Sequence, residues 1–268
     1  MPESPEVQAL AEFLDARTRS GRIEGIDLDE FRALKTRQRP LTELAGATIS
    51  AVRRFGKHLD VQTDAAHLVI SFGRAGWARW NGEAAPGAAP VIGRIAVGDD
   101  LIELTDAGEW LSIGLSVVDD PAEVAAIAKL GPDPAEPGFT RSAFDHAVVG
   151  RRKQLKALLQ EQESFAGIGN AYSDEILHAA KLPPAVQAAS LDEEQRDRLF
   201  SAMTSVVRDA VAARRSIPPH ELKAAKVAAM RVHGRGGEVC PVCGDVIVDQ
   251  ASSSTSSQHC PTCQLAQP

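Results

Sequence analysis

Hydrophobic residues recur with helical spacing at the start of the chain. Over residues 4–16 the apolar side chains Val7, Leu10 and Leu14 fall on one face, which predicts an amphipathic helix. Ser4 precedes this repeat and is suited to cap the helix, because its hydroxyl can accept a bond from a free backbone N–H. We therefore expect the folded structure to begin with a helix.

Between about residue 42 and residue 118 the pattern changes to short runs of β-forming residues. Turn-forming residues separate the runs, and the stretch 81–90 is especially rich in glycine, proline and alanine. Several short strands at this spacing indicate an antiparallel sandwich or barrel. The runs are ATISAVRRF, HLDVQT, AHLVISF, RIAVG, LIELT and LSIGLSVV.

Helical periodicity returns in the second half of the chain. Residues 130–139 contain three prolines and predict a linker before it. The last stretch, 236–268, holds all four cysteines and a serine-rich run. The predicted helices cover 151–162, 171–180, 191–214 and 219–227.

Composition excludes several classes of protein. Hydrophobic residues make up 44% and charged residues 24% of the 268 positions, so the chain can form a globular core. No apolar run approaches the ~20 residues of a membrane span, and the first residues lack the basic start of a secretion signal. We expect a cytoplasmic protein with no membrane partner.

The net charge of −7 is distributed unevenly. Residues 1–140 carry −8, residues 141–235 carry +4 and residues 236–268 carry −3. Only the middle segment is suited to a polyanion such as DNA. The pI of about 5.5 argues against tight, indiscriminate DNA binding, and it is compatible with a local basic groove.

The cysteines form two C-x2-C pairs separated by sixteen residues, Cys240/Cys243 and Cys260/Cys263. Each pair can turn two thiolates toward one ion, and two pairs complete the tetrahedron that Zn²⁺ prefers. Four thiolates leave no open position, so a structural rather than a catalytic ion is predicted. Two disulfides or free thiols are the alternatives, and a cytosolic location disfavours the disulfides.

A glycine-rich turn lies in the basic segment, at Gly167-Ile168-Gly169-Asn170. Such a turn can point backbone N–H groups at a phosphate, and Asn170 can cap the helix that follows, whose N-terminus attracts anions. An ordinary helix–helix turn is the alternative interpretation. Four basic residues at 151–156 precede it and favour the nucleic-acid interpretation.

The N-terminus offers a nucleophile. Removal of Met1 would leave Pro2 with a terminal secondary amine, whose pKa near ~8 keeps part of it neutral at pH 7. Such an amine can attack an aldehyde-like carbon, while Glu3 and Glu6 move protons. The alternative is a helix start whose glutamates favour the helix dipole. Lys57 follows a glycine and is either part of the site or a solvated hairpin residue.

These motifs occur together in one known family. MPESPEV, RRFGKHL, LGPDP, GIGNAYSDEIL and the paired cysteines follow one another as in the formamidopyrimidine-DNA glycosylase and endonuclease VIII family, which the chain resembles throughout. The resemblance implies an α+β fold: an N-terminal antiparallel β-sandwich with flanking helices, then a helix–two-turns–helix domain with a zinc finger. DNA would lie between the two lobes. The expected domains are 1–133, a linker at 134–140, 141–235 and 236–268.

The family removes oxidised bases and then cleaves the abasic strand by β,δ-elimination. By resemblance, Pro2 is the nucleophile at the sugar C1′, Glu3 the acid and base at the ring oxygen, and Glu6 a carboxylate near the site. Lys57 would contact phosphate and assist at the sugar. Asn170, with the two glycines of its turn, would bind backbone phosphate. The damaged base would be flipped out of the stack.

Three positions depart from the family pattern. Its zinc finger carries an arginine before the second cysteine pair; counting back from Cys260 places Thr255 there, and 236–268 contains no Lys or Arg. The neutral Thr255 hydroxyl then stands where the family has an arginine that can bond a phosphate through two N–H groups. The turn that often carries a methionine offers Arg74. The loop that supplies an arginine and an aromatic wedge offers Trp110, either as a wedge or as a core residue.

The leading hypothesis is a bifunctional DNA glycosylase and AP lyase, a nucleoid-associated monomer with one structural Zn²⁺. Its partner would be double-stranded DNA containing damaged bases or abasic sites. The alternative is a protein that binds such lesions without excising them, which the missing finger arginine favours. A zinc-ribbon interaction protein is a third interpretation. The nearest candidate for a base-reading loop is 216–227, which has no diagnostic residue.

Overall fold

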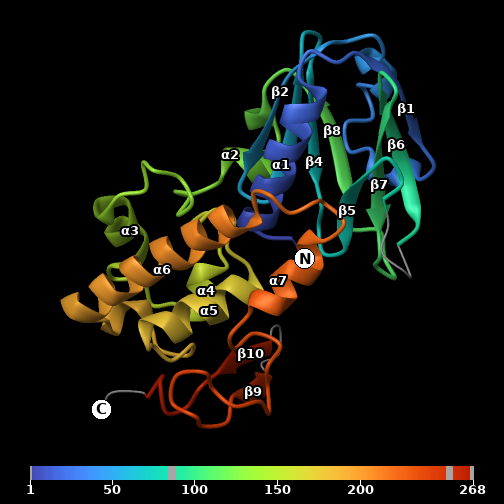
Figure 1. The fold of residues 1–268 in the computed structure, drawn as a ribbon. Helices are drawn as coiled ribbons and strands as arrows, with labels where there is room; N and C mark the ends of the chain where they lie inside the picture. The colour runs from blue at the N-terminus through green and yellow to red at the C-terminus, as the bar shows by residue number, and fades with distance from the viewer. Residues whose placement is uncertain (1, 84–88, 252–255, 266–268) are drawn as a thin grey trace. The chain divides into compact units, whose positions relative to one another are not determined.

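The chain divides into two compact units in the computed structural model, which describes residues 2–83, 89–251 and 256–265. We call them the β unit and the helical unit (Figure 1). The β unit comprises Met1–Lys129 and Arg214–Ala225, and the helical unit comprises Leu130–Ala213 and Lys226–Pro268.

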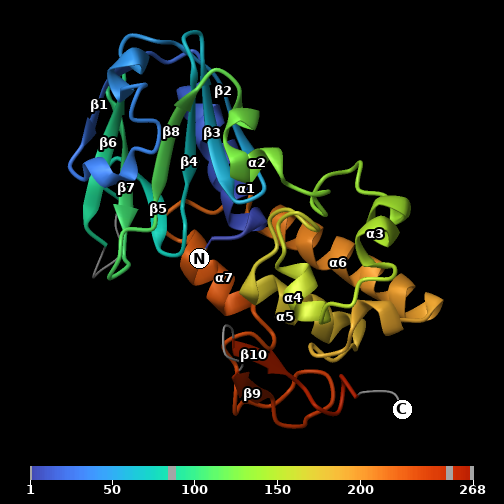
Figure 2. The same cartoon turned by 180° about the vertical axis from the view of Figure 1, so that it is seen from behind.

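Two four-stranded antiparallel sheets build the β unit, with strand orders β1-β6-β7-β5 and β2-β3-β4-β8. Both sheets can be followed from either side of the molecule in Figures 1 and 2. The predicted N-terminal antiparallel β structure is confirmed. The strands are β1 (Ile23–Leu28), β2 (Ile49–Phe55), β3 (His58–Thr63), β4 (His67–Ser71), β5 (Gly76–Trp80), β6 (Val91–Val97), β7 (Asp100–Asp106) and β8 (Gly114–Val118).

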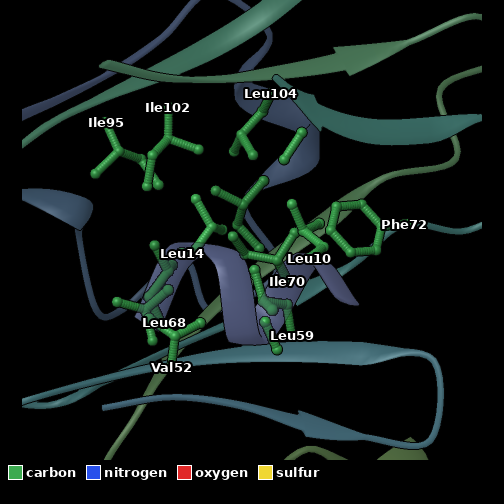
Figure 3. Close-up of a cluster of buried hydrophobic side chains, with 14 of the residues drawn as sticks. Leu10, Leu14, Val52, Leu59, Leu68, Ile70, Phe72, Ile95, Ile102 and Leu104 are labelled. Atoms are coloured by element: carbon green, nitrogen blue, oxygen red, sulfur yellow. The ribbon is translucent and has the colours of Figure 1, made fainter. Parts of the chain in front are cut away.

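Helix α1 (Ser4–Thr18) confirms the first predicted helix and packs against β2. Its apolar face is fully buried, including Leu10 and Leu14. Figure 3 shows these two leucines among side chains from both sheets, so the helix fills the core of the β unit and its position is fixed by packing. The labelled partners are Val52, Leu59, Leu68, Ile70, Phe72, Ile95, Ile102 and Leu104.

The sequence missed β1 and β5, and both are edge strands that pair on one side only. In β5 the buried face consists of Gly76, Ala78 and Trp80, so two of its three inward positions are small. In β1 the sequence IEGIDL carries a glycine and two acids. Neither strand shows the strong apolar alternation that identifies a half-buried strand.

The helical unit contains a series of mostly short helices and a cysteine-rich hairpin. The predicted helix over 151–162 is wrong in extent, because the backbone N–H groups of Leu155 and Lys156 bond to the carbonyls of Val186 and Pro184 instead of extending it backwards. The helices of the chain after α1 are α2 (Ala125–Ala128), α3 (Arg141–Val148), α4 (Leu155–Leu159), α5 (Asn170–Ala180), α6 (Glu193–Arg214) and α7 (Leu222–Ala229). The hairpin strands are β9 (Val248–Ala251) and β10 (Ser256–His259).

The proline-rich stretch 130–139 packs on the helical unit. Gly131 N–H donates to Gln162 O at 2.9 Å, and Ala166 N–H donates to Pro132 O at 3.1 Å. A Cβ at position 131 would lie 2.3 Å from Glu163 O, so only glycine fits this approach. The stretch is therefore anchored beside the glycine-rich turn. Among the described residues, no helix combines the length and apolar character required to span a membrane.

Candidate functional site

Reciprocal hydrogen bonds hold the start of α1. Glu3 is the N-cap residue: its side chain accepts from the backbone of Glu6, and the Glu6 carboxylate accepts from the Glu3 N–H at 3.2 Å. This capping box corrects the expectation that Ser4 caps the helix, since Ser4 is its first residue. Both glutamates are 2% exposed. Two buried carboxylates are thus fixed next to Pro2, which is half-buried.

Arg214, which the sequence did not single out, supplies positive charge to this turn. Its Nε lies 3.8 Å from Glu6 Oε1, with side chains 5% and 3% exposed. Its neighbour Arg215 pairs with Glu12 at 3.1 Å, but these side chains are 60% and 34% exposed. The two adjacent arginines therefore make one buried and one solvent-exposed ion pair.

Replacing Arg214 with methionine is expected to destabilise the protein by about 3–5 kcal/mol, because it removes the guanidinium that lies beside the buried Glu6 carboxylate. The same change at Arg215 is expected to cost less than about 1 kcal/mol, since exposed pairs contribute little. Urea unfolding of both variants measures the difference. Equal losses of stability would show that the Arg214–Glu6 pair is not a buried anchor.

Lys57 occupies a two-residue turn between β2 and β3. Gly56 has φ +55, a conformation that favours glycine in such hairpins. Arg54 fastens this turn to α1: its Nε donates to Gln8 Oε1 at 2.9 Å and its Nη1 donates to Gly56 O at 3.0 Å. Gln8 is less than two helical turns from Glu3. The fold therefore ties the Lys57 turn to the N-terminal part of α1.

Arg74 and Trp110 lie on two surface loops of the β unit, at the β4–β5 turn and between β7 and β8. Trp110 is 81% exposed, which excludes its interpretation as a core residue, and Arg74 is also exposed. Ser112 connects the loops, because its Oγ accepts from the backbone N–H groups of Arg74 and Ala75 at 3.1 and 3.0 Å. The two loops are therefore held as one surface feature.

Asp106 is the centre of this connection. Its carboxylate accepts from the N–H groups of Gly108, Ser112 and Ile113 and from the Ser112 hydroxyl, at 2.7–3.0 Å. Burial would raise the pKa of Asp106, but these bonds lower it below its usual value. Gly73 has φ +54, and a Cβ there would lie 2.1 Å from Ser112 O. A charged, fully bonded carboxylate thus shapes the loop that displays Trp110.

The glycine-rich turn precedes α5. Gly167 has φ +86 and donates its N–H to Gln162 Oε1 at 3.0 Å. Gly169 is the N-cap residue and Asn170 the first residue of α5, so Asn170 does not cap the helix as expected. Instead the Asn170 Oδ1 accepts from Gln160 Nε2 at 3.3 Å. The cap residue has no side chain; Gly167 and Gly169 are buried, and Asn170 is partly exposed at the start of α5.

The four cysteines converge as their spacing predicts. Their sulfur atoms lie within 4.8 Å of one another, with Cys240–Cys263 at 3.8 Å and Cys243–Cys260 at 3.3 Å. Tetrahedral Zn²⁺ with bonds of ~2.3 Å requires sulfurs about 3.8 Å apart, so the donor set fits the ion. Burial and then the neighbouring sulfurs raise the pKa of Cys263, so a cation is needed to hold all four as thiolates.

The structure also shows where local turns support this cluster. Gly244, directly after the first pair, has φ +82, and its N–H donates to Cys240 O at 3.0 Å. The antiparallel β9–β10 hairpin lies between the two cysteine pairs. Thr255 lies outside the described residues.

The candidate base-reading stretch 216–227 belongs largely to the β unit. Trp77 Nε1 donates to Pro219 O at 3.0 Å, and Leu222 is fully buried in the core of this unit. The helix expected over 219–227 begins three residues later, at Leu222.

Arg54, Asp106 and Ser112 are support residues that the sequence interpretation overlooked. Arg54 lies inside the RRFGKHL motif, and its place on β2 was the available signal. Asp106 and Ser112 bracket the loop of Trp110, where Asp and Ser commonly bond to nearby backbone N–H groups. Arg214 had no local signal, because its partner Glu6 is far away in the sequence.

Comparisons with known proteins match two segments of the chain. Residues 1–107 match the formamidopyrimidine-DNA glycosylase N-terminal domain, and residues 130–219 match the formamidopyrimidine-DNA glycosylase H2TH domain. The formamidopyrimidine-DNA glycosylases of Heliobacterium modesticaldum and Sphingopyxis alaskensis are 31% and 32% identical, over 98% of this chain and 100% of theirs. An uncharacterized formamidopyrimidine-DNA glycosylase-like protein of Mycobacterium tuberculosis is 43% identical over 50% of this chain and 84% of its own length.

Solved structures show the same fold. The Lactococcus lactis glycosylase in complex with abasic-site DNA has a TM-score of 0.85 at 24% identity, covering 98% of this chain and 100% of that one. A mutant of it with Fapy-dG DNA also has a TM-score of 0.85. An antiparallel β unit, an H2TH unit and a four-cysteine hairpin together define a class of DNA-repair glycosylase. This chain belongs to the formamidopyrimidine-DNA glycosylase family, which confirms the resemblance found in its sequence.

Proposed function

We propose that the protein is a bifunctional DNA glycosylase and AP lyase acting on oxidised bases or abasic sites in double-stranded DNA. Family membership supports the glycosylase class, and the related structures hold damaged or abasic-site DNA. One observation carries the proposal: the buried Glu3–Glu6 capping box adjoins Pro2, on a helix fastened to the Lys57 turn.

The reaction begins when the Pro2 nitrogen uses its lone pair to form a bond to C1′, and the bond from C1′ to the base breaks. The base leaves with a proton. Glu3 protonates the ring oxygen as the C1′–O4′ bond opens, leaving a cationic iminium on Pro2. This cation accepts the electron pair released when a C2′ proton is removed. The C3′–O bond then breaks in β-elimination and the 3′-phosphate leaves. Removal of the C4′ proton next supplies the electron pair with which the C5′–O bond breaks in δ-elimination, releasing the 5′-phosphate, after which water releases Pro2.

DNA contacts would come from both units. Lys57 and Arg74 would meet phosphates through charge-assisted bonds, and Trp110 would stack on or wedge between bases. In the helical unit, the turn of Gly167 and Gly169 and the side chain of Asn170 would bind backbone phosphate. We place this monomeric enzyme at the nucleoid, where its substrate lies.

One structural Zn²⁺ would be held by Cys240, Cys243, Cys260 and Cys263. The ion would cross-link the two C-x2-C turns and supply the folding energy of the hairpin. Four sulfur ligands leave no site for substrate, so the role is architectural.

A lesion-binding protein that does not excise is the alternative, favoured by the absence of Lys and Arg from 236–268. One experiment separates the two functions: incubation with an abasic-site duplex and borohydride. A covalent protein–DNA adduct supports the lyase. Retention of DNA without an adduct supports the binder, and loss of both rejects a function on this DNA. The mass of the N-terminus is checked first, because a retained Met1 blocks the amine.

The substitution Thr255→Arg restores the positive charge that the family carries at this position of its zinc finger. It is expected to tighten binding to damaged duplex DNA. One added phosphate contact steepens the slope of log K against log salt by about 0.9. Fluorescence anisotropy over a salt series measures this slope. The control is Thr262→Arg, which adds the same charge at an exposed residue between Cys260 and Cys263. An unchanged slope in Thr255→Arg would place that position away from the DNA.

A further inference from the structure

We propose that His178 is the outer-sphere partner of the metal site, donating an N–H bond to the Cys240 sulfur and thereby retaining the metal. This inference rests on the structural-zinc part of the proposed function. His178 lies in the last turn of α5 and is 4% exposed, and its Nε2 is 3.4 Å from Cys240 Sγ. Cys240 is itself 2% exposed, so the contact is shielded from water.

The direction of the bond follows from the chemistry of the sulfur. A metal-bound Cys240 is a thiolate and can only accept, so the Nε2 of His178 must carry the hydrogen. The bond disperses part of the negative charge on the sulfur. Outer-sphere partners of this kind orient the ligand, and their loss typically costs about 10–100-fold in metal affinity.

His178 is a partner of the ligand and not a ligand. The cluster whose donor atoms lie within 4.8 Å of one another consists of the four cysteines, and His178 is outside it. Four sulfurs already satisfy the tetrahedral preference of zinc. His178 is therefore a positioning residue acting through Cys240.

Asp174 and Glu175, on the same helix as His178, hold the cysteine-rich hairpin and the residues before it through bonds that do not involve His178. The Glu175 carboxylate accepts from the N–H groups of Arg231, Val232 and His233 at 2.9–3.0 Å. Asp174 accepts from the Ser257 hydroxyl at 3.3 Å. None of these bonds involves His178, so its replacement is expected to alter metal retention more than folding. Helix α5 also begins at Asn170, so the metal partner and the proposed phosphate contact share one helix.

The test uses the full chain loaded with Zn²⁺ and challenged with excess chromophoric chelator. His178→Phe, which keeps the ring volume and loses the donor, is expected to release zinc about 10–100-fold faster. His178→Gln, whose amide N–H can reach the same place, is expected to stay near the wild-type rate. His146→Gln, at an exposed site on α3, is the matched control. Co²⁺-substituted protein should keep its four-sulfur charge-transfer absorption in every variant.

Several results would overturn the inference. If His178→Phe releases zinc at the wild-type rate, the His178–Cys240 bond does not retain the metal. If the Phe and Gln variants release zinc equally faster, the loss of the N–H donor is not the cause. A loss of the four-sulfur absorption in His178→Phe would make the residue structural for the site. If the wild-type chain binds no Zn²⁺ at all, the proposed metal centre itself fails, which is a separate outcome.

Discussion

Replacing Pro2 with glycine is expected to lower formation of the borohydride-trapped adduct by roughly 10³-fold or more, the scale that follows loss of a catalytic nucleophile. The pyrrolidine nitrogen gives an iminium that stays charged, whereas glycine gives a neutral imine that must first gain a proton. Pro2 precedes the capping box, so the variant should keep α1. Adduct yield on an abasic-site duplex, with DNA affinity measured in parallel, checks the prediction.

Two further variants test whether a lower adduct yield in Pro2→Gly reflects loss of the nucleophile. Pro5→Ala, inside the first turn of α1, is the control and should trap DNA like the wild type. Glu3→Gln should slow trapping by about 10²–10⁴-fold with little change in affinity, because a proton-transfer group is lost. An undiminished adduct in Pro2→Gly would move the nucleophile elsewhere, and Lys57 would then be tested first.

Removing one of the four proposed zinc ligands by Cys243→Ser is expected to unfold the C-terminal hairpin while the β unit stays folded. The hydrophobic cluster around the cysteines contains four buried residues, and two of them are cysteines of the proposed zinc site: Val232, Cys240, Ile247 and Cys260. So small a core cannot fold alone, whereas structural zinc contributes about 10–16 kcal/mol in zinc-finger peptides. Hydrogen exchange should show loss of protection in β9 and β10 and retained protection in β2 to β4.

The matched control is Val242→Ser, which places the same side chain at an exposed neighbouring position. It should leave exchange unchanged. A strong chelator should reproduce the Cys243→Ser pattern in the wild type. Full protection of β9 and β10 after either treatment would contradict a metal-dependent fold.

Part of the site was predictable from the sequence, because it depends on local chemistry. The C-x2-C spacing predicted a cluster because each pair is a self-contained turn, and Gly244 has the positive φ that this turn requires. Helix α1 was predictable because three leucine and valine positions repeat along one face. Glu3 capped the helix in place of Ser4 because the reciprocal bond with Glu6 satisfies two backbone N–H groups.

Other features depended on partners far along the chain. Trp110 was equally compatible with a core and a surface position, and its exposure follows from a loop shaped by Asp106. The predicted helix over 151–162 shortened because the strand-like pairing of Gln154 with Gln187 competes for the backbone. Contrary to expectation, Asn170 is not the N-cap residue of α5, because Gly169 occupies that position.

The sequence by itself determined the family, the order of the motifs, the first helix and the four-cysteine cluster. These depend on residue type and on spacings of a few residues, which local geometry converts directly into turns and helix faces. Tertiary structure decided which charges are buried and which residues support the site: Arg214 beside Glu6, Arg54 beneath the Lys57 turn, and His178 against Cys240. Such pairs form between distant segments, because burial of the apolar core brings their side chains together and excludes the water that would otherwise solvate them.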